Sequence, residues 1–119
     1  MNGKIKTYRD LDIWKKSIEL VSRIYMLTNQ FPNTEIYGLS SQMRRASVSV
    51  PSNVAEGFRR RHNKEYRHFL YISLGSCAEL ETQATIAKNL LYLKESEEQE
   101  ILERIDHISR MVFNLIKKL

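Results

Sequence analysis

The sequence predicts an all-α fold, an antiparallel up-down-up-down four-helix bundle with a kinked second helix. Three observations lead to this prediction. Apolar residues recur at three- and four-residue spacing in four segments, the stretches between them are short, and the 119 residues include only four glycines and two prolines. Helices with one apolar face and short connections pack as antiparallel neighbours around a common core.

The first helix is predicted over residues 10–30 and has an unusually wide apolar face. Two stripes run side by side, one formed by Leu11, Trp14, Ile18, Val21 and Tyr25 and the other by Ile13, Leu20, Ile24, Leu27 and Phe31. Pro32 ends this helix because proline disfavours helical geometry in the residue before it. An apolar face wider than one core contact requires indicates a second partner, so we expect a homo-oligomer.

The second helix is predicted over residues 35–58. Its apolar stripe comprises Ile36, Leu39, Met43, Ala46, Val50 and Val54. Pro51 lies inside this helix, removes one backbone donor and clashes with the carbonyl of Ser47, which predicts a kink or a local break. Polar side chains around Pro51 are expected to hydrogen-bond the freed backbone groups; they are Ser47, Ser49, Ser52 and Asn53.

The third and fourth helices complete the predicted bundle. The third is expected over residues 64–93 with Asn63 as its N-cap, and its stripe comprises Leu70, Leu74, Cys77, Leu80, Ala84, Ala87 and Leu91. The fourth opens on the capping-box pattern Ser96-Glu97-Glu98-Gln99. Its stripe then follows in alternating steps of four and three residues: Ile101, Ile105, Ile108, Val112, Leu115 and Leu119.

The length predicts a single domain over residues 1–119, with residues 1–9 as an N-terminal tail. Cys77 is the only cysteine and lies within an apolar pattern, so we expect a buried, unreactive thiol. The N-terminus lacks the apolar segment of a secretory signal, and no apolar run approaches the roughly 20 residues that span a bilayer. These features predict a cytoplasmic protein that does not enter the membrane.

Positive charge is concentrated in the middle of the chain. Residues 44–68 contain seven basic residues against Glu56 and Glu65, whereas residues 69–119 have more acidic than basic residues. Clustered arginines suit a phosphate backbone because each guanidinium can donate to two phosphate oxygens. We therefore predict RNA or DNA binding through Arg44, Arg45, Arg59, Arg60, Arg61, Lys64 and Arg67.

The alternative interpretation is a protein–protein assembly or adaptor module without a nucleic-acid ligand. In that case the arginines act at helix ends and subunit interfaces, and Arg44 and Arg45 serve assembly. The triplet Arg59-Arg60-Arg61 is the better candidate for ligand contact because a connecting turn is exposed. Tyr66, His68 and Tyr71 are interleaved with the charge, where they either stack on bases or, as we favour for the tyrosines, pack within the protein.

Enzymatic chemistry finds little support in the sequence. Glu65 and His68 have the spacing of a di-iron bundle motif, but such sites need two such pairs and two further glutamates. The pair Glu103 and His107 has the wrong spacing. No glycine-rich phosphate loop or Cys/His metal pattern occurs. We therefore predict a non-enzymatic protein without a cofactor, a metal or a small-molecule substrate.

Several short motifs together resemble the family of 23S ribosomal RNA intervening-sequence proteins. The resemblance extends from Asp10 to about Tyr92, and its motifs are Trp14-Lys15, Phe31-Pro32, Tyr37-Gly38-Leu39, Gln42-Met43-Arg44-Arg45-Ala46, Pro51-Ser52-Asn53-Val54-Ala55-Glu56-Gly57 and Gly75-Ser76 with Glu79-Leu80. The resemblance implies an up-down helical bundle that assembles as a ring, with a homopentamer as the expected state. The family name describes where some of its genes lie, which is not a function.

Overall fold

The fold comprises four α-helices and two short 3-10 helices. The computed structural model describes residues 4–119, and no β-strand occurs among them. In chain order the elements are η1 (Tyr8–Asp10), α1 (Asp12–Thr28), η2 (Asn33–Glu35), α2 (Leu39–Arg59), α3 (Asn63–Asn89) and α4 (Glu95–Lys118). The predicted all-α four-helix fold class is confirmed. Residues 1–3 of the predicted N-terminal tail lie outside the described residues.

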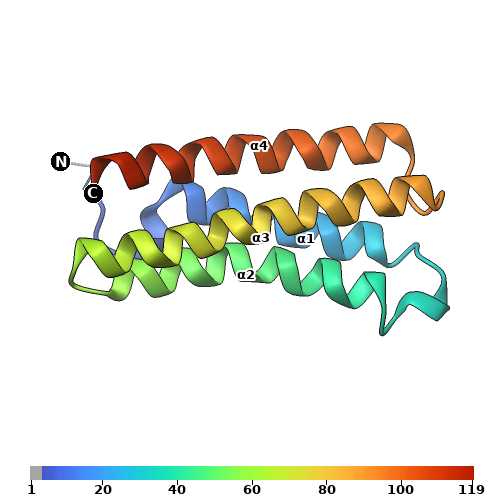
Figure 1. The fold of residues 1–119 in the computed structure, drawn as a ribbon, viewed down its shortest axis with the longest axis horizontal. Helices are drawn as coiled ribbons and strands as arrows, with labels where there is room; N and C mark the ends of the chain where they lie inside the picture. The colour runs from blue at the N-terminus through green and yellow to red at the C-terminus, as the bar shows by residue number, and fades with distance from the viewer. Residues whose placement is uncertain (1–3) are drawn as a thin grey trace.

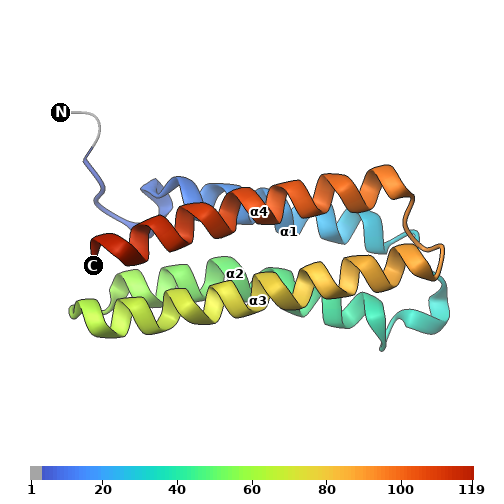
Figure 2. The ribbon, with the colours of Figure 1, turned by 45° about the horizontal axis from the view of Figure 1, so that its top comes forward.

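Successive helices run in opposite directions along an elongated bundle of 46 × 25 × 19 Å (Figure 1). Close backbone contacts join α1 to α2 and α4, and α3 to α2 and α4, whereas the diagonal pairs make none within residues 4–119. The α2–α3 turn lies at the same end as η1 and the C-terminus of α4, and the other two connections lie at the opposite end (Figures 1 and 2). No helix in this part of the chain is long and apolar enough to cross a membrane.

One hydrophobic core runs along the bundle and receives side chains from all four helices. The predicted stripes of α2, α3 and α4 supply most of it. On α1, the buried apolar residues are Ile13, Leu20, Ile24 and Leu27, while Ile18 and Tyr25 of the neighbouring stripe are 39% and 42% exposed. The surplus apolar width of the first helix therefore faces solvent in the single chain.

Two residues that the stripes assign to the core are exposed. Ile36 precedes α2 rather than lying within it, because η2 takes up the chain between Pro32 and that helix. Leu91 follows the end of α3 and has a left-handed backbone with φ of 66°. There the N–H of Tyr92 donates to the carbonyl of Ala87 at 2.9 Å, which closes the helix four residues before the predicted end at residue 93.

Both predicted helix caps are wrong by one or two residues. His62 is the N-cap of α3, and Asn63 is its first helical residue. The helix α4 begins at Glu95 instead of after Ser96, and its first turn is closed by the Glu97 carboxylate, which accepts from the Lys94 N–H at 2.8 Å. An acidic side chain in the first turn satisfies an orphan backbone donor as well as a serine does. This part of the capping box is therefore present, but it begins at Lys94, two residues before the predicted Ser96.

The helix α2 passes through Pro51 as one continuous helix, so the predicted local break does not occur. The polar side chains around it bond neighbouring groups: Ser47 donates to the carbonyl of Arg44 at 2.9 Å, and Asn53 to that of Ser49 at 2.8 Å. From α3, Ser73 donates to the carbonyl of Val50 at 2.9 Å. None of these bonds is to the carbonyl of Ser47, so the predicted bond to the freed backbone group is not found among the described residues.

Candidate nucleic-acid interface

The turn between α2 and α3 carries the arginine triplet. Arg59 is the last residue of α2, and Arg60 leaves the helix with an extended backbone while its N–H donates to the carbonyl of Gly57 at 3.0 Å. Arg61 and His62 complete the turn before α3 begins. All three arginines are exposed, as the sequence predicted for a short connection.

Aromatic side chains pack against this turn. A methyl group on Gly57 would lie 2.9 Å from Cβ of Phe69 and 3.0 Å from Cδ1 of Tyr66, so only glycine permits this approach of α2 to α3. The guanidinium of Arg60 lies over the Phe69 ring at 5.0 Å, and that of Arg59 lies over the Tyr8 ring at 5.5 Å. Cation–π contacts of this kind restrict where the two arginines reach.

A basic pocket of about 560 Å³ lies between this turn and the N-terminal segment, and it is lined by Lys6, Thr7, Phe58, Arg59, Arg60 and Arg61. Lys6 was not among the predicted contact residues. The only sign of it in the sequence was the positive charge near the start of the chain. Asp10 fixes this segment because its carboxylate accepts the N–H groups of Lys6 and Thr7 at 2.9 and 3.0 Å. These bonds lower the pKa of the Asp10 carboxyl below its ordinary value.

Charge near the pocket is only partly neutralised. Arg60 forms an ion pair with Glu56 at 3.0 Å. Within residues 4–119, the side chains of Arg61 and Lys64 make no hydrogen bond or ion pair, and Arg59 makes only its aromatic contact. We call the set of basic residues at this end of the bundle the basic end; it comprises Lys4, Lys6, Arg9, Arg59, Arg60, Arg61, Lys64, Arg67, Lys117 and Lys118.

Two of the seven predicted contact residues are occupied within the fold. Arg44 is half-buried and donates to Thr28 Oγ1 at 2.8 Å and Asn29 Oδ1 at 2.9 Å, and it also lies over a tyrosine ring of α1. Arg67 donates to the carbonyl oxygen of Leu119 at 2.6 Å and so joins α3 to the end of α4. These contacts give both arginines a structural role in the single chain.

Arg45 lies apart from the arginine triplet. It is exposed near the start of α2 and lines a polar groove with residues of α3. The structure therefore brings together Arg59, Arg60, Arg61 and Lys64, but it does not bring Arg45 to the same place. Adjacent residues on a helix point in different directions, which separates Arg44 from Arg45 as well.

The aromatic residues near the arginines differ in accessibility. Tyr66 is half-buried edge-on against Phe58, and burial raises the pKa of its hydroxyl to about 12. Tyr71 is 54% exposed on the outer face of α3, and His68 lies on the surface against Phe69. Tyr66 is therefore packed in the protein, while the rings of His68 and Tyr71 face solvent in the single chain.

The described residues contain neither a metal-binding cluster nor an exposed thiol. No cluster of three or more His, Cys, Asp or Glu side chains there could hold a metal ion. Cys77 is buried, and burial raises the pKa of its thiol, as expected for an unreactive cysteine.

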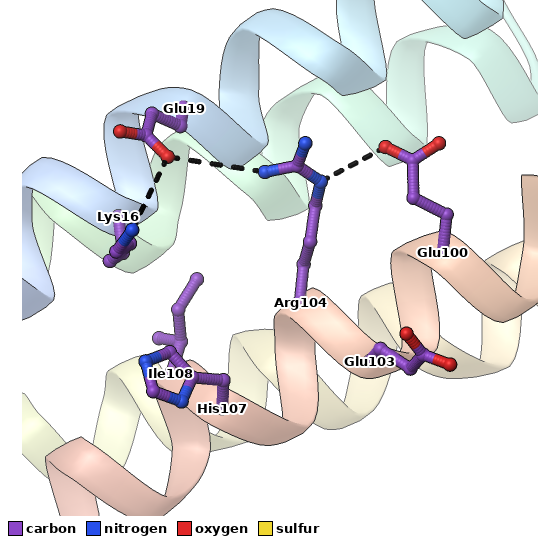
Figure 3. A pocket seen from close by; sticks show the side chains of 7 residues that line it. All are labelled: Lys16, Glu19, Glu100, Glu103, Arg104, His107 and Ile108. Atoms are coloured by element: carbon purple, nitrogen blue, oxygen red, sulfur yellow. Dashed lines mark hydrogen bonds and ion pairs between the residues drawn. The ribbon is translucent and has the colours of Figure 1, made fainter.

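A second charged pocket of about 250 Å³ lies between α1 and α4 (Figure 3). The Glu100 carboxylate accepts from Arg23 at 2.8 to 3.1 Å and from Arg104 at 3.0 Å. Arg104 also reaches Glu19 at 4.0 Å. The hydrogen bond from Arg23, followed by that from Arg104, holds the pKa of Glu100 below its ordinary value. Because these charges neutralise one another, the network serves to join α1 to α4.

Comparisons with known proteins find a matching family and a similar solved structure. The family model described as 23S rRNA-intervening sequence protein matches residues 9–114. A crystal structure of a protein with unknown function, from the S23 ribosomal protein family of Bacteroides thetaiotaomicron VPI-5482, superposes with a TM-score of 0.79 at 20% sequence identity, covering 88% of this chain and 98% of the other. No curated protein sequence matches this chain significantly. On the extent of the family match, this chain belongs to the 23S rRNA-intervening sequence protein family.

Proposed function

We propose that this protein is a non-enzymatic, oligomeric helical bundle that binds RNA or DNA through its basic end. The observation that supports this most strongly is the basic pocket, where Lys6 joins the arginine triplet from a distant part of the sequence. Arg61 and Lys64 have no acidic partner within the described chain, so their charge is available to phosphate. Contacts to phosphate bind without reading base sequence.

The charge is segregated along the long axis of the bundle. The basic end contains ten Lys and Arg residues in residues 4–10, 56–67 and 117–119, against three acidic side chains, Asp10, Glu56 and Glu65. At the opposite end the first turn of α4 is acidic. A polyanion is therefore attracted to one end of the molecule, and binding is driven by release of counterions from the nucleic acid.

Salt dependence tests this function. Binding of a fluorescent duplex to the variant R59A/R61A/K64A is measured by anisotropy over a range of salt concentrations. The log–log slope is expected to flatten by up to about 0.9 for each lost duplex phosphate contact, which is about 2.7 for all three. Binding that is absent at physiological ionic strength, or independent of salt, would overturn the proposal.

A matched control removes the same charge from elsewhere. The variant K16A/K88A/R110A also loses three positive charges, but Lys16 and Arg110 lie within α1 and α4 and Lys88 lies in the last turn of α3, away from the α2–α3 turn. It should keep the slope of the wild-type protein. Equal flattening in both variants would show that net charge alone matters and that the basic end is not the site.

The oligomeric part of the proposal rests on an apolar groove of about 280 Å³ between η1, α1 and α2. It is lined by Tyr8, Trp14, Ile18, Val21, Val48, Pro51, Ser52 and Ala55. Ile18 and Val48 are each 39% exposed there. A second copy covering this groove would remove that apolar surface from water. We propose a closed ring, with five subunits favoured, on the family resemblance.

Size-exclusion chromatography with light scattering tests assembly, and the 260/280 absorbance ratio of unstripped protein tests carried nucleic acid. The variants I18E and V48E are expected to shift the mass toward that of one chain while the circular dichroism spectrum stays helical. A monomeric wild-type protein would refute the assembly proposal.

The second candidate function is an assembly or adaptor module without a nucleic-acid ligand. The same unpartnered apolar groove favours it. It predicts an oligomer with a low 260/280 ratio that shows no salt-dependent retention of nucleic acid, and that outcome would replace the first proposal.

A further inference from the structure

A polar groove between α2 and α3 lies toward the end of the bundle opposite the arginine triplet. Its volume is about 580 Å³, and its walls are formed by Tyr37, Ser41, Gln42, Arg45, Ala46, Ser49 and Glu79. Most of these residues fall within or beside the motifs Tyr37-Gly38-Leu39 and Gln42-Met43-Arg44-Arg45-Ala46. The packing of the core does not account for Tyr37, Arg45 and Glu79, which are all exposed.

Three side chains in this groove have unused binding capacity. The ring of Tyr37 is 97% exposed, the highest value among the large apolar and aromatic residues of the described chain. Arg45 and Glu79 make no hydrogen bond or ion pair within residues 4–119, although they line the same groove. An aromatic face, a guanidinium and a carboxylate thus remain free on its walls.

The exposed tyrosine is held in a rigid turn. The Glu35 carboxylate accepts the N–H of Leu39 and the hydroxyl of Tyr92, each at 3.0 Å, so the turn is tied to the start of α2 and to the α3–α4 connection. A methyl group on Gly38 would lie 2.5 Å from Glu35 Oε1, so a larger residue there would displace this carboxylate from its two bonds. The backbone of Tyr37 is thus held before binding, and its exposed ring is free to turn onto a ligand.

The chemistry of these groups fits a nucleobase better than a bare phosphate. A flat π face such as that of Tyr37 stacks on any base, and a guanidinium donates to the acceptors on a base edge. A carboxylate accepts from an exocyclic amino group, but it repels a free phosphate. In a duplex the base faces are covered by stacking, so only an unpaired base presents both its face and its edge.

We infer that this groove binds an unpaired nucleobase of a single-stranded RNA or DNA, an inference that rests on the proposed nucleic-acid function. Tyr37 stacks on the base, while Arg45 donates to its acceptor groups and Glu79 accepts from its amino group. The basic end holds phosphates of the same strand. The protein therefore prefers single strands to duplexes.

The test compares a single-stranded oligocytidine with a duplex of the same length by fluorescence anisotropy. The variant Y37A is expected to bind the single strand about 5- to 150-fold more weakly, the range equivalent to about 1–3 kcal/mol per stacked base, with duplex binding unchanged. Y37F keeps the ring and should bind like the wild-type protein. The matched control F113A removes an exposed aromatic ring of α4 outside the groove and should also bind like the wild type.

The outcomes separate this inference from the proposed function. Wild-type protein that binds no nucleic acid refutes both. A second result is that the wild-type protein binds nucleic acid with a salt-dependent slope while Y37A keeps its full affinity, or loses affinity equally for single strand and duplex. That result refutes the base-binding groove and leaves the proposed function standing. A smaller mass for Y37A in light scattering would show that the groove forms a subunit contact, and this would also refute the base-binding inference.

The role of Glu79 has a separate test. Uracil has no exocyclic amino group, so the wild-type protein should bind oligocytidine more tightly than oligouridine. The variant E79Q should narrow this difference. Equal affinity of the wild-type protein for the two homopolymers would refute the contact assigned to Glu79.

Discussion

The same substitution, glycine to alanine, should have opposite effects at two helical positions. Gly57 is buried in α2 where that helix approaches α3, and an alanine Cβ there would lie 2.9 Å from Cβ of Phe69 and 3.2 Å from the backbone oxygen of Tyr66. Gly75 is exposed on α3, and a Cβ there would have no neighbouring atom within 4 Å. The intrinsic preference for alanine over glycine acts at both positions.

The expected magnitudes follow from these contacts. At Gly75 alanine gains about 0.5–1 kcal/mol from its helix preference, with nothing to oppose it. At Gly57 that gain is outweighed because two of the three nearest atoms are a Cβ and a backbone oxygen, which cannot rotate away. Overpacking of this kind costs about 1–3 kcal/mol. The net result is a destabilisation of up to about 2 kcal/mol, and because the helix preference is common to both variants, they should differ by the overpacking cost of about 1–3 kcal/mol.

Thermal unfolding followed by circular dichroism measures the difference. At equal protein concentration, G57A should melt at a lower temperature than the wild-type protein and G75A at a higher one, by roughly 4 °C per kcal/mol. The wild-type protein is the common reference, and helix content before unfolding should match in all three. A G57A variant as stable as G75A would refute the close packing of α2 on α3 at the arginine turn.

Three further predictions concern other contacts. Arg44→Ala removes the hydrogen bonds to Thr28 and Asn29 and should lower the free energy of unfolding in urea by about 1–3 kcal/mol; lysine, which lacks the planar fork, should not restore it. Leu91→Gly should raise the melting temperature, because glycine adopts the φ of 66° without the roughly 1 kcal/mol strain of leucine, which buries little there. The pKa of Glu100 is lowered in the fold, so its ionised form stabilises the protein at pH values above the ordinary pKa of 4.5. This stabilisation is lost as the pH falls below 4.5. The melting temperature of E100Q should therefore decline less steeply over this acid range than that of the wild type. An unchanged acid profile in E100Q, a Leu91→Gly variant less stable than wild type, or full rescue by Arg44→Lys would contradict the respective argument.

The sequence contained enough information for the helices but not for their ends. The stripe from Ile101 to Val112 is buried as predicted, because burial against three neighbours requires apolar side chains at helical spacing. Leu90 to Leu93 continues the apolar pattern beyond α3, yet the chain turns there through Leu91. Periodicity records which residues are apolar, and it does not record where hydrogen bonding between main-chain groups closes a helix.

Local sequence predicted the exposure of consecutive residues in a turn, but it did not predict contacts between distant segments. The exposed arginine triplet followed from the turn alone. The internal partners of Arg44 and Arg67 lie 15 and 52 residues away along the chain, so their structural roles were not visible in local sequence. Lys6 reaches the basic pocket for the same reason, because η1 packs beside α2.

The proposed contacts adjoin on the bundle and use different residues apart from Tyr8. The apolar groove lies between η1, α1 and α2, whereas the basic end lies at the α2–α3 turn, and the Tyr8 ring both lines the groove and lies under the Arg59 guanidinium. If copies associate through their sides with their long axes parallel, all basic ends fall on one face of the assembly, and one strand can contact several of them. Binding to a second subunit then becomes an intramolecular step, which raises the affinity without any new contact in a single subunit. A variant that only breaks assembly should therefore weaken nucleic-acid binding while each subunit keeps its own phosphate contacts.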